Sequence, residues 1–452
     1  MTVESLLVEA EKTTEEVMDA KLEEEVDDSK VVVDKCSSYR EDSNFLSDLK
    51  EFERKALNDF KARLEEAIIA GTLLEKVDKA APEEEEQEKV PESDEEEKCV
   101  EVDVEVSIWG VPLLPSKGHE GTDVVLLKFL RAREFKVGDA FEMLEKTLRW
   151  RKEQKVESGL HEDDELSSKL SSAGYLSGVD REGHPICYNV YGAFATEELY
   201  QAAFGSAENR QKFLKWRVQL MEEGIRKLDL RPGGVSSLLQ VNDLRNAPGP
   251  SKKNIRIATK EAIELMLDNY PEFVARNIFI NVPFWYYAFN TILSPFFTQR
   301  SRRKFVVARP SKVTETLLKY IPAEEIPIQY GGLKRDNDFE FSADDGTVSE
   351  LSVKAGSTEV IEVPLEEVGK TLVWDITVLG WEVNYKEEFV PSDEGSYSVI
   401  VQKSKKVRAG QEPIRNTFRN NEPGKLVITV DNSSNKKKRV LYRYKTKKCS
   451  SF

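Results

Sequence analysis

The chain is 452 residues long, which is enough for two or three domains of ordinary size. Its formal net charge of −16 is concentrated in the first 100 residues, which hold 32 Asp and Glu against 14 Lys and Arg, whereas the rest carries 50 acidic and 52 basic side chains. Charges act over about 10 Å at physiological salt, so the overall acidity does not exclude an anionic partner.

The cysteines and the apolar runs exclude several classes of protein. The four cysteines form no close pair, which excludes a disulfide scaffold and a four-cysteine zinc site: Cys36, Cys99, Cys187 and Cys449. The opening sequence has neither a basic n-region nor an apolar h-region, so we expect no signal peptide. The longest apolar run, residues 278–289, is shorter than the roughly twenty residues that a membrane span needs. We therefore expect a cytoplasmic protein whose membrane contacts are peripheral.

Residues 1–107 form an acidic arm that we predict to be mostly disordered, because blocks such as 83–86 and 94–97 cannot bury enough apolar surface. The exception is a possible helix over residues 43–70, with Ser43 as N-cap and Gly71 as a stop. Its apolar residues fall near helical spacing: Leu46, Leu49, Leu57, Phe60, Leu64 and Ile68. Two interpretations stay open, a helix docked on its own protein and a helix that binds a protein partner of the arm.

From Trp109 the composition becomes globular. Residues 108–160 read as a helical lead-in with helices over 123–135 and 137–155. Residues 161–336 alternate between short apolar strands at 186–191, 236–243, 278–282 and 304–308 and helices at 208–228 and 252–268. Apolar strands separated by helices predict an α/β domain with a largely parallel sheet covered on both faces.

Residues 337–452 change pattern again, since apolar residues alternate with polar ones and no helical period is present. The alternation is clearest in three runs that contain Leu372 to Val378, Leu426 to Val430 and Val440 to Tyr444. Strands of period two with turns between them predict an antiparallel β-sandwich.

Signals of catalysis are weak. The sequence lacks a G-x-S-x-G elbow, a P-loop, an H-E-x-x-H helix and a G-x-G-x-x-G turn after a strand. Its three histidines, His119, His161 and His184, fall in loop-like stretches, and we interpret them as surface or turn residues. We therefore predict a protein that is not an enzyme and that has neither a metal nor a cofactor.

An amphipathic aromatic segment follows the strand at 278–282. Its apolar side chains lie close together or at helical spacing: Phe284, Trp285, Phe289, Ile292, Leu293, Phe296 and Phe297. Four cations come directly after it: Arg300, Arg302, Arg303 and Lys304. This combination suits the boundary between acyl chains and phosphates, although a core helix with a basic loop fits the same pattern.

A second basic cluster lies near the C-terminus, where eight cations fall within thirteen residues: Lys436, Lys437, Lys438, Arg439, Arg443, Lys445, Lys447 and Lys448. On a strand, Arg443 and Lys445 share a face opposite to Val440 and Tyr442. We predict that this cluster, together with Arg300, Arg302 and Arg303, docks on an anionic membrane. A nucleic-acid patch is the alternative, but no nucleic-acid-binding motif surrounds it, so we expect no nucleic-acid partner.

Several motifs resemble those of a known family. Residues 126–135, LLKFLRAREF, resemble the lead-in signature of CRAL-TRIO lipid-transfer proteins. Residues 178–186, 270–272, 278–283 and 321–332 fit the same family in order and spacing. Residues 374–391 are similar to part of a GOLD domain. An acidic arm followed by CRAL-TRIO and GOLD domains resembles the arrangement of plant patellins.

The resemblance implies a bound phospholipid in a pocket floored by the sheet and closed by a gate helix over 284–297. It implies headgroup contacts from Arg133, Glu272, Ser301 and Lys304. Two positions depart from the phosphatidylinositol-transfer branch of yeast, Glu134 and Phe273, which argues against choline-lipid exchange.

The same resemblance implies a non-enzymatic factor in membrane trafficking and cytokinesis. Such a protein would be cytoplasmic and would associate with phosphoinositide-containing membranes such as the cell plate or the plasma membrane. A protein-recruiting scaffold with a structural pocket and a carrier of a prenyl lipid remain as alternatives.

Overall fold

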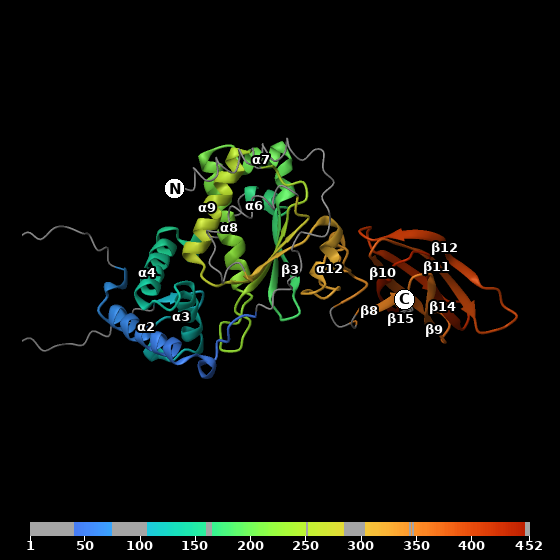
Figure 1. Cartoon of the computed structure of the whole chain (residues 1–452), viewed down its shortest axis with the longest axis horizontal. Coiled ribbons are helices and arrows are strands. Elements are labelled where there is room, and N and C mark those ends of the chain that lie inside the picture. The colour runs from blue at the N-terminus through green and yellow to red at the C-terminus, as the bar shows by residue number, and fades with distance from the viewer. Residues whose placement is uncertain are drawn as a thin grey trace, which may run out of the picture.

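The computed structural model describes residues 40–74, 106–159, 165–249, 252–283, 303–342, 345 and 348–447. The predicted gate over 284–297, together with Arg300, Ser301 and Arg302, lies outside these residues, as do the acidic blocks at 83–86 and 94–97. The described residues form a helical lead-in, an α/β domain and a β-sandwich, which follow one another in space as they do in the sequence (Figure 1). Within the described ranges, no helix has the length and apolarity needed to cross a bilayer.

The lead-in consists of three main helices: α2 (Glu51–Ile69), α3 (Glu120–Ala132) and α4 (Val137–Glu153). Helix α2 buries Leu57, Phe60 and Leu64 against α3 and α4, and the rings of Phe60 and Phe141 lie 6.3 Å apart. The helix predicted in the arm is thus docked on its own protein. It starts at Glu51, not at residue 43, and the lead-in starts with it, not at residue 108, because α2 completes the core of α3 and α4.

Short elements accompany these helices: η1 (Leu46–Asp48), η2 (Thr72–Leu74), β1 (Ser107–Ile108), β2 (Val111–Pro112), η3 (Pro115–Lys117), α5 (Val156–Gly159) and α6 (Glu165–Leu170). A buried cluster joins the lead-in to the next domain. Arg151 of α4 donates to Glu222 at 2.5 Å, and the hydroxyl of Tyr270 donates to the same carboxylate at 2.6 Å.

The α/β domain contains a five-stranded sheet in the order β3-β4-β5-β6-β7. Strands β4 to β7 are parallel and β3 is antiparallel to β4, so the predicted largely parallel sheet is confirmed. The strands are β3 (Gly174–Val179), β4 (Pro185–Val190), β5 (Leu238–Asp243), β6 (Val274–Ile280) and β7 (Phe305–Val307).

Helices cover both faces of this sheet. Helices α7 (Glu197–Phe204), α8 (Ala207–Ile225) and α9 (Lys253–Asn269) lie on one side, and α12 (Val313–Leu317) lies on the other (Figure 1). Alternate residues of β4 follow this division: Cys187 belongs to the buried cluster that contains Phe213 and Ala258, whereas Tyr188 belongs to the one that contains Val313 and Leu317. The connections η4 (Tyr191–Ala195), η6 (Pro310–Lys312) and η7 (Ile328–Tyr330) complete the domain.

The C-terminal domain is the predicted β-sandwich. Its two antiparallel sheets have the strand orders β13-β10-β15-β8 and β12-β11-β14-β9. Trp374, Tyr385 and Phe389 are buried in the core of the sandwich. The indole of Trp374 donates to Glu387 at 2.9 Å. The strands are β8 (Ser349–Val353), β9 (Ser357–Leu365), β10 (Thr371–Leu379), β11 (Glu382–Pro391), β12 (Val399–Arg408), β13 (Ile414–Arg419), β14 (Gly424–Asn432) and β15 (Lys438–Lys447).

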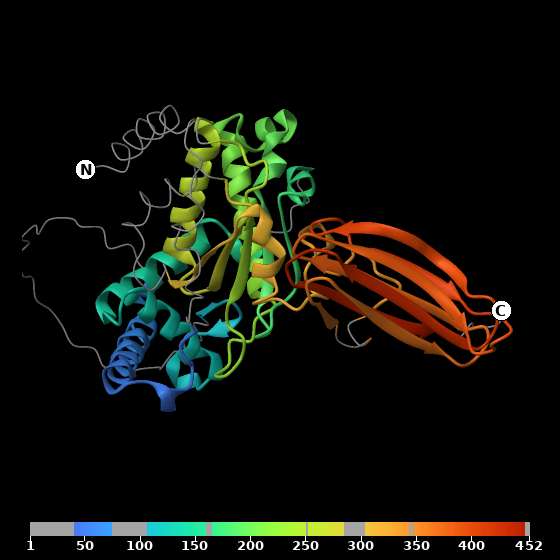
Figure 2. The same ribbon diagram turned by 45° about the vertical axis from the view of Figure 1, so that its right-hand side comes forward.

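The sandwich meets the α/β domain on the side of α12 (Figure 2). At this joint Arg443 donates to Asp375 at 2.9 Å and to the carbonyl oxygen of Leu333 at 2.8 Å. Asp375 is fully buried and also accepts two bonds of 2.7 Å from Arg415. The guanidinium of Arg443 lies 4.1 Å from the centre of the Phe341 ring. The joint is therefore a network of buried charges around one aromatic ring.

This network corrects the predicted basic patch. Arg443 does not face a membrane, because its side chain is only 10 % exposed and neutralises Asp375. Lys438 is also buried, where its ammonium donates to the carbonyl oxygen of Gly380. Lys445 and Arg439 form ion pairs with Asp345 and Glu350, both at 2.6 Å. Of the six predicted docking residues from 436 to 445, Lys436 and Lys437 are exposed in the turn before β15.

Candidate functional site

The amino ends of β4 to β7 lie along one edge of the sheet, because these strands are parallel. The residues just before the strands therefore come together although they are far apart in the sequence. They are His184 before β4, Ser236 and Ser237 before β5, Glu272 before β6 and Lys304 before β7. We call this row the amino edge.

The sequence-predicted residues Glu272 and Lys304 form an ion pair at this edge. The Lys304 ammonium lies 2.6 Å from the Glu272 carboxylate and 2.9 Å from the carbonyl oxygen of Val274. Their side chains are 10 % and 16 % exposed, so the pair is largely shielded from water. Glu272 has a φ of 54°, a left-handed conformation that costs a non-glycine residue about 1–3 kcal/mol and that is often found at functional sites.

A second lysine reaches the same place from the lead-in. The ammonium of Lys128, in α3, donates to the carbonyl oxygens of Ser236 at 2.7 Å and Glu272 at 2.9 Å. It also lies 4.3 Å from the centre of the Phe273 ring. Burial lowers the pKa of this amine to about 7, although the carboxylates of Glu41 and Glu272 oppose that shift. Lys128 thus adds a buried donor whose charge is poised near neutral pH.

Arg133, the lead-in cation predicted from the family resemblance, is placed differently. It follows the last residue of α3, where its guanidinium contacts the carbonyl oxygen of Ala132 at 3.4 Å. Its charge also acts on Glu142 of α4, whose pKa is lowered mainly by Lys146. Among the described contacts, Lys128 is the α3 cation that the structure joins to Glu272.

His184 is the centre of a neighbouring buried cluster. Its Nδ1 lies 2.9 Å from Asp180, and its Nε2 lies 2.9 Å from the carboxylate of Glu41 in the acidic arm. The same carboxylate accepts a 2.5 Å bond from the hydroxyl of Ser237. Burial alone would lower the pKa of His184, but the bonds to Asp180 and Glu41 raise it to about 9. The imidazole is therefore positively charged at neutral pH.

The carboxylate of Glu41 responds to the same contacts. Burial would raise its pKa, but the bonds from His184 and Ser237 lower it to about 2. From the sequence, His184 was predicted to be a surface or turn residue, and the buried cluster around it was not predicted. The turn that carries Asp180 four residues before His184 was a signal for it, and the four buried apolar neighbours of Lys128 were a signal for a buried lysine.

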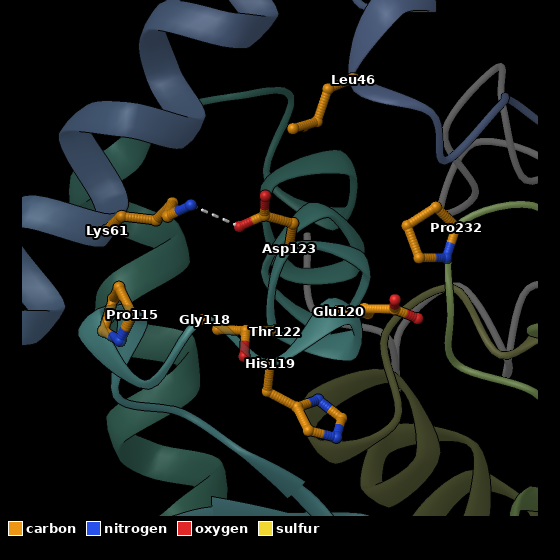
Figure 3. A pocket seen from close by; sticks show the side chains of 9 residues that line it. All are labelled: Leu46, Lys61, Pro115, Gly118, His119, Glu120, Thr122, Asp123 and Pro232. Carbon is orange, nitrogen blue, oxygen red and sulfur yellow. Dashed lines mark ion pairs between the residues drawn. The ribbon is translucent and has the colours of Figure 1, made fainter.

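Two surface pockets are lined by residues other than those of the amino edge. One, of about 380 Å³, lies between the arm, α2 and the start of α3, and is lined by Leu46, Lys61, Pro115, Gly118, His119, Glu120, Thr122, Asp123 and Pro232 (Figure 3). Lys61 and Asp123 form an ion pair of 2.8 Å at its wall. The other, of about 310 Å³, lies between the α/β domain and the sandwich, beside Gln329 and Glu412. Both pockets have charged side chains in their linings, such as Lys61 and Asp123 in the first and Lys334 in the second, which does not suit an acyl chain.

Comparisons with known proteins agree with this architecture. Family models match residues 56–146 as "CRAL/TRIO, N-terminal domain", residues 170–332 as "CRAL/TRIO domain" and residues 354–438 as "Patellin-1-like, C-terminal GOLD domain". The first model includes most of α2, in agreement with a lead-in that starts at that helix.

Similar proteins extend the likeness to nearly the whole chain. Patellin-4 of Arabidopsis thaliana is 50 % identical over 98 % of this chain and 95 % of its own length. Patellin-3 of the same plant is 45 % identical over 96 % and 83 %. Phosphatidylinositol transfer protein sfh5 of Emericella nidulans is 32 % identical over 51 % of this chain and 58 % of its own length. With its lead-in, its α/β domain and its GOLD sandwich in this order, the chain belongs to the patellin family.

Proposed function

We propose that this protein is a non-enzymatic, phospholipid-binding peripheral membrane protein that recognises a phosphoinositide headgroup and can transfer the lipid between membranes. The observation that carries the proposal is the shielded Glu272–Lys304 pair at the amino edge. The likeness to a phosphatidylinositol transfer protein of a fungus supports it.

The headgroup chemistry follows from the side chains at this edge. A phosphate needs cations and directed donors, and the Lys304 ammonium supplies a compact positive charge beside the Glu272 carboxylate. The Glu272 carboxylate would accept hydrogen bonds from the hydroxyls of an inositol ring. We assign the hydroxyl of Ser301 and the guanidinium of Arg133, which directly follows α3, to the same headgroup.

The acyl chains need only apolar surface, and burying each CH₂ contributes about 0.8 kcal/mol. We assign this role to the apolar residues of the gate, Phe284, Trp285, Phe289, Ile292, Leu293, Phe296 and Phe297. Since a bilayer offers the same stabilisation, exchange requires the gate to open at the membrane. Arg300, Arg302, Arg303, Lys436 and Lys437 would attract the protein to anionic lipids there, at about 1 kcal/mol each near the surface.

Transfer of fluorescent phosphatidylinositol between vesicles tests the headgroup site. Lys304→Ala should reduce the transfer rate at least tenfold, because it leaves the Glu272 carboxylate without its cation next to a phosphate. The matched control is Lys312→Ala, whose side chain is 60 % exposed in a pair with Glu315 and should leave the rate unchanged. Arg133→Ala tests the assignment of Arg133 separately. Unchanged transfer by Lys304→Ala protein of normal stability would refute the site.

The cellular part of the proposal is a cytoplasmic protein that acts in membrane trafficking, at the cell plate during cytokinesis or at the plasma membrane. The acidic arm would recruit a protein partner there. A fluorescent fusion in dividing plant cells should move from the cytoplasm to the growing cell plate, and the Lys436→Glu/Lys437→Glu double variant should do so less.

A further inference from the structure

The arm contributes one residue to the amino edge that its composition does not explain. Glu41 lies 143 residues before His184 and 196 before Ser237, yet its two carboxylate oxygens bond to these two side chains at 2.9 and 2.5 Å. Ser237 is fully buried and His184 is 5 % exposed. One acidic residue of a strongly acidic arm is thus held by specific donors, whereas a solvated charge would have none.

The donors around this carboxylate form a built anion site. His184 is held by Asp180, which fixes the ring so that Nε2 points at Glu41. Lys128 adds positive potential from behind, since its charge acts on both Glu41 and Glu272. The site we call the cradle therefore consists of His184, Ser237 and Lys128. A phosphate oxygen makes the same demands on such donors as a carboxylate oxygen does.

The cradle adjoins the headgroup pair. Glu272 connects the two, because its carbonyl oxygen accepts from Lys128 while its carboxylate accepts from Lys304. A phosphate-bearing ring seated on Lys304 and Glu272 would therefore have the cradle as its next cationic neighbour. The carboxylate of Glu41 occupies that position in the structure.

The segment that carries Glu41 is held by polar contacts. Arg131 donates to the carbonyl oxygen of Ser43 and to Asn44, both at 2.6 Å, and Asn44 donates to Ser236 at 3.1 Å. Phe45 and Leu46 remain 49 % and 45 % exposed, so little apolar surface opposes release of the segment up to Leu46. The anchored part begins after it, because Leu49 is 6 % exposed and packs in the same core as Leu57 of α2. Residues 40–46 can therefore leave while the lead-in stays folded.

We propose that residues 40–46 of the arm form an internal latch in which Glu41 occupies an anion site on His184, Ser237 and Lys128, and that a phosphomonoester group on an inositol headgroup competes for this site. The inference rests on the proposed function, since it names the regulation of the same edge. The latch lowers the affinity for phosphorylated headgroups by the fraction of molecules in which it is closed. Binding of such a headgroup releases the arm.

Two variants of the full-length protein open the latch in different ways. Glu41→Gln removes the carboxylate charge and keeps its shape, and Asn44→Ala removes contacts of the segment without touching the cradle. Both should bind phosphatidylcholine vesicles that contain phosphatidylinositol 4-phosphate about tenfold more tightly than the wild type. Glu51→Gln, which changes the net charge equally on the exposed start of α2, should bind as the wild type does.

Amide hydrogen exchange of residues 40–46 measures the latch itself. Exchange should rise in both variants without ligand, and in the wild type when these vesicles are added. Soluble inositol 1,4-bisphosphate shows whether the competitor is a free phosphorylated headgroup or a membrane lipid. If the soluble compound releases the arm, the site recognises the phosphate alone. If the arm is released by the vesicles and not by the soluble compound, the site recognises the lipid.

Equal vesicle binding by the wild type, Glu41→Gln and Asn44→Ala would overturn the latch and leave the proposed function standing. A gain in Glu51→Gln as large as that in Glu41→Gln would overturn it as well, because net charge would then be the cause. Absence of vesicle binding in every form would overturn the proposed function together with the latch.

Discussion

Replacing Arg443 with alanine tests whether the C-terminal cations serve the domain joint or a membrane. The change removes the charged bond to Asp375 at 2.9 Å, the bond to the carbonyl oxygen of Leu333 at 2.8 Å and the contact with the Phe341 ring. A charge-assisted bond contributes about 1.5–3 kcal/mol, and a desolvated cation–π contact about 1–2 kcal/mol.

The expected loss is about 3 kcal/mol. Breaking a buried ion pair completely costs roughly 3–5 kcal/mol. The loss in Arg443→Ala stays at the lower end of this range, because Arg415 still neutralises Asp375. For a domain of this size, we expect the melting temperature of the sandwich to fall by about 12–24 °C in scanning calorimetry. Binding to anionic vesicles at a temperature where both forms are folded should not change.

Arg439→Ala is the matched control, because Arg439 lies on the same strand in an ion pair whose side chains are 42 % and 40 % exposed. Such a surface pair contributes about 0–1 kcal/mol. A melting temperature of Arg443→Ala within 2 °C of that of Arg439→Ala would refute the reasoning, and so would a loss of vesicle binding specific to Arg443→Ala.

Three further predictions concern the arm, the lead-in and the membrane. The pKa of His184 is raised from 6.5 to about 9, so its stabilising contribution is full below pH 6.5 and is lost as the pH rises through 9. The pKa of Lys128 is shifted in the opposite direction, to about 7, so this lysine adds stability as the pH rises above 7. Comparing the free energies of unfolding of the wild type and His184→Gln at each pH separates the effect of His184 from that of Lys128. That difference in the free energy of unfolding should be about 3 kcal/mol at pH 6 and should shrink by pH 10, whereas a constant difference would contradict the charged pairing. Phe60→Ala should cost about 3–5 kcal/mol in urea denaturation and expose α2 to hydrogen exchange, and a loss below 1 kcal/mol would show that α2 is not anchored by this ring. The Lys436→Ala/Lys437→Ala double variant should weaken binding to anionic vesicles by about 2 kcal/mol at low salt, and unchanged sedimentation with the vesicles would remove these lysines from the docking surface.

Much of the fold was predictable because it follows from periodic apolar patterns. Strands β4 to β7 are short apolar runs between helices. Strand β14 alternates between buried and half-buried side chains as a sandwich requires, whereas β10 is buried on both faces. Strand β3 was not predicted, because its side chains are mostly half-buried and include Ser177 and Gly178, which weaken the pattern. The start of the lead-in was misplaced because residues 75–105 separate α2 from α3 in the sequence, and packing in space ignores that separation.

The site was less predictable, because parallel strands gather residues from many places. Glu272 and Lys304 followed from the family resemblance, whereas Lys128, His184 and Glu41 come from three further segments that no local pattern links. Arg443 shows the opposite error. Its place on the strand face away from Val440 was predicted correctly, but that face is covered by Phe341 and Asp338 from the segment before β8. The buried Asp375 within an apolar strand was the signal that a cation had to come inward.

The most direct test of the lipid site is mass spectrometry of the intact protein under native conditions, followed by identification of the released ligand. We expect a phospholipid of one-to-one stoichiometry, rich in phosphatidylinositol, on the wild type and a large loss of that species from Lys304→Ala but not from Lys312→Ala. A prenyl lipid in its place, or a folded wild-type protein that carries no lipid and takes none up from vesicles, would show that this is not a phospholipid site.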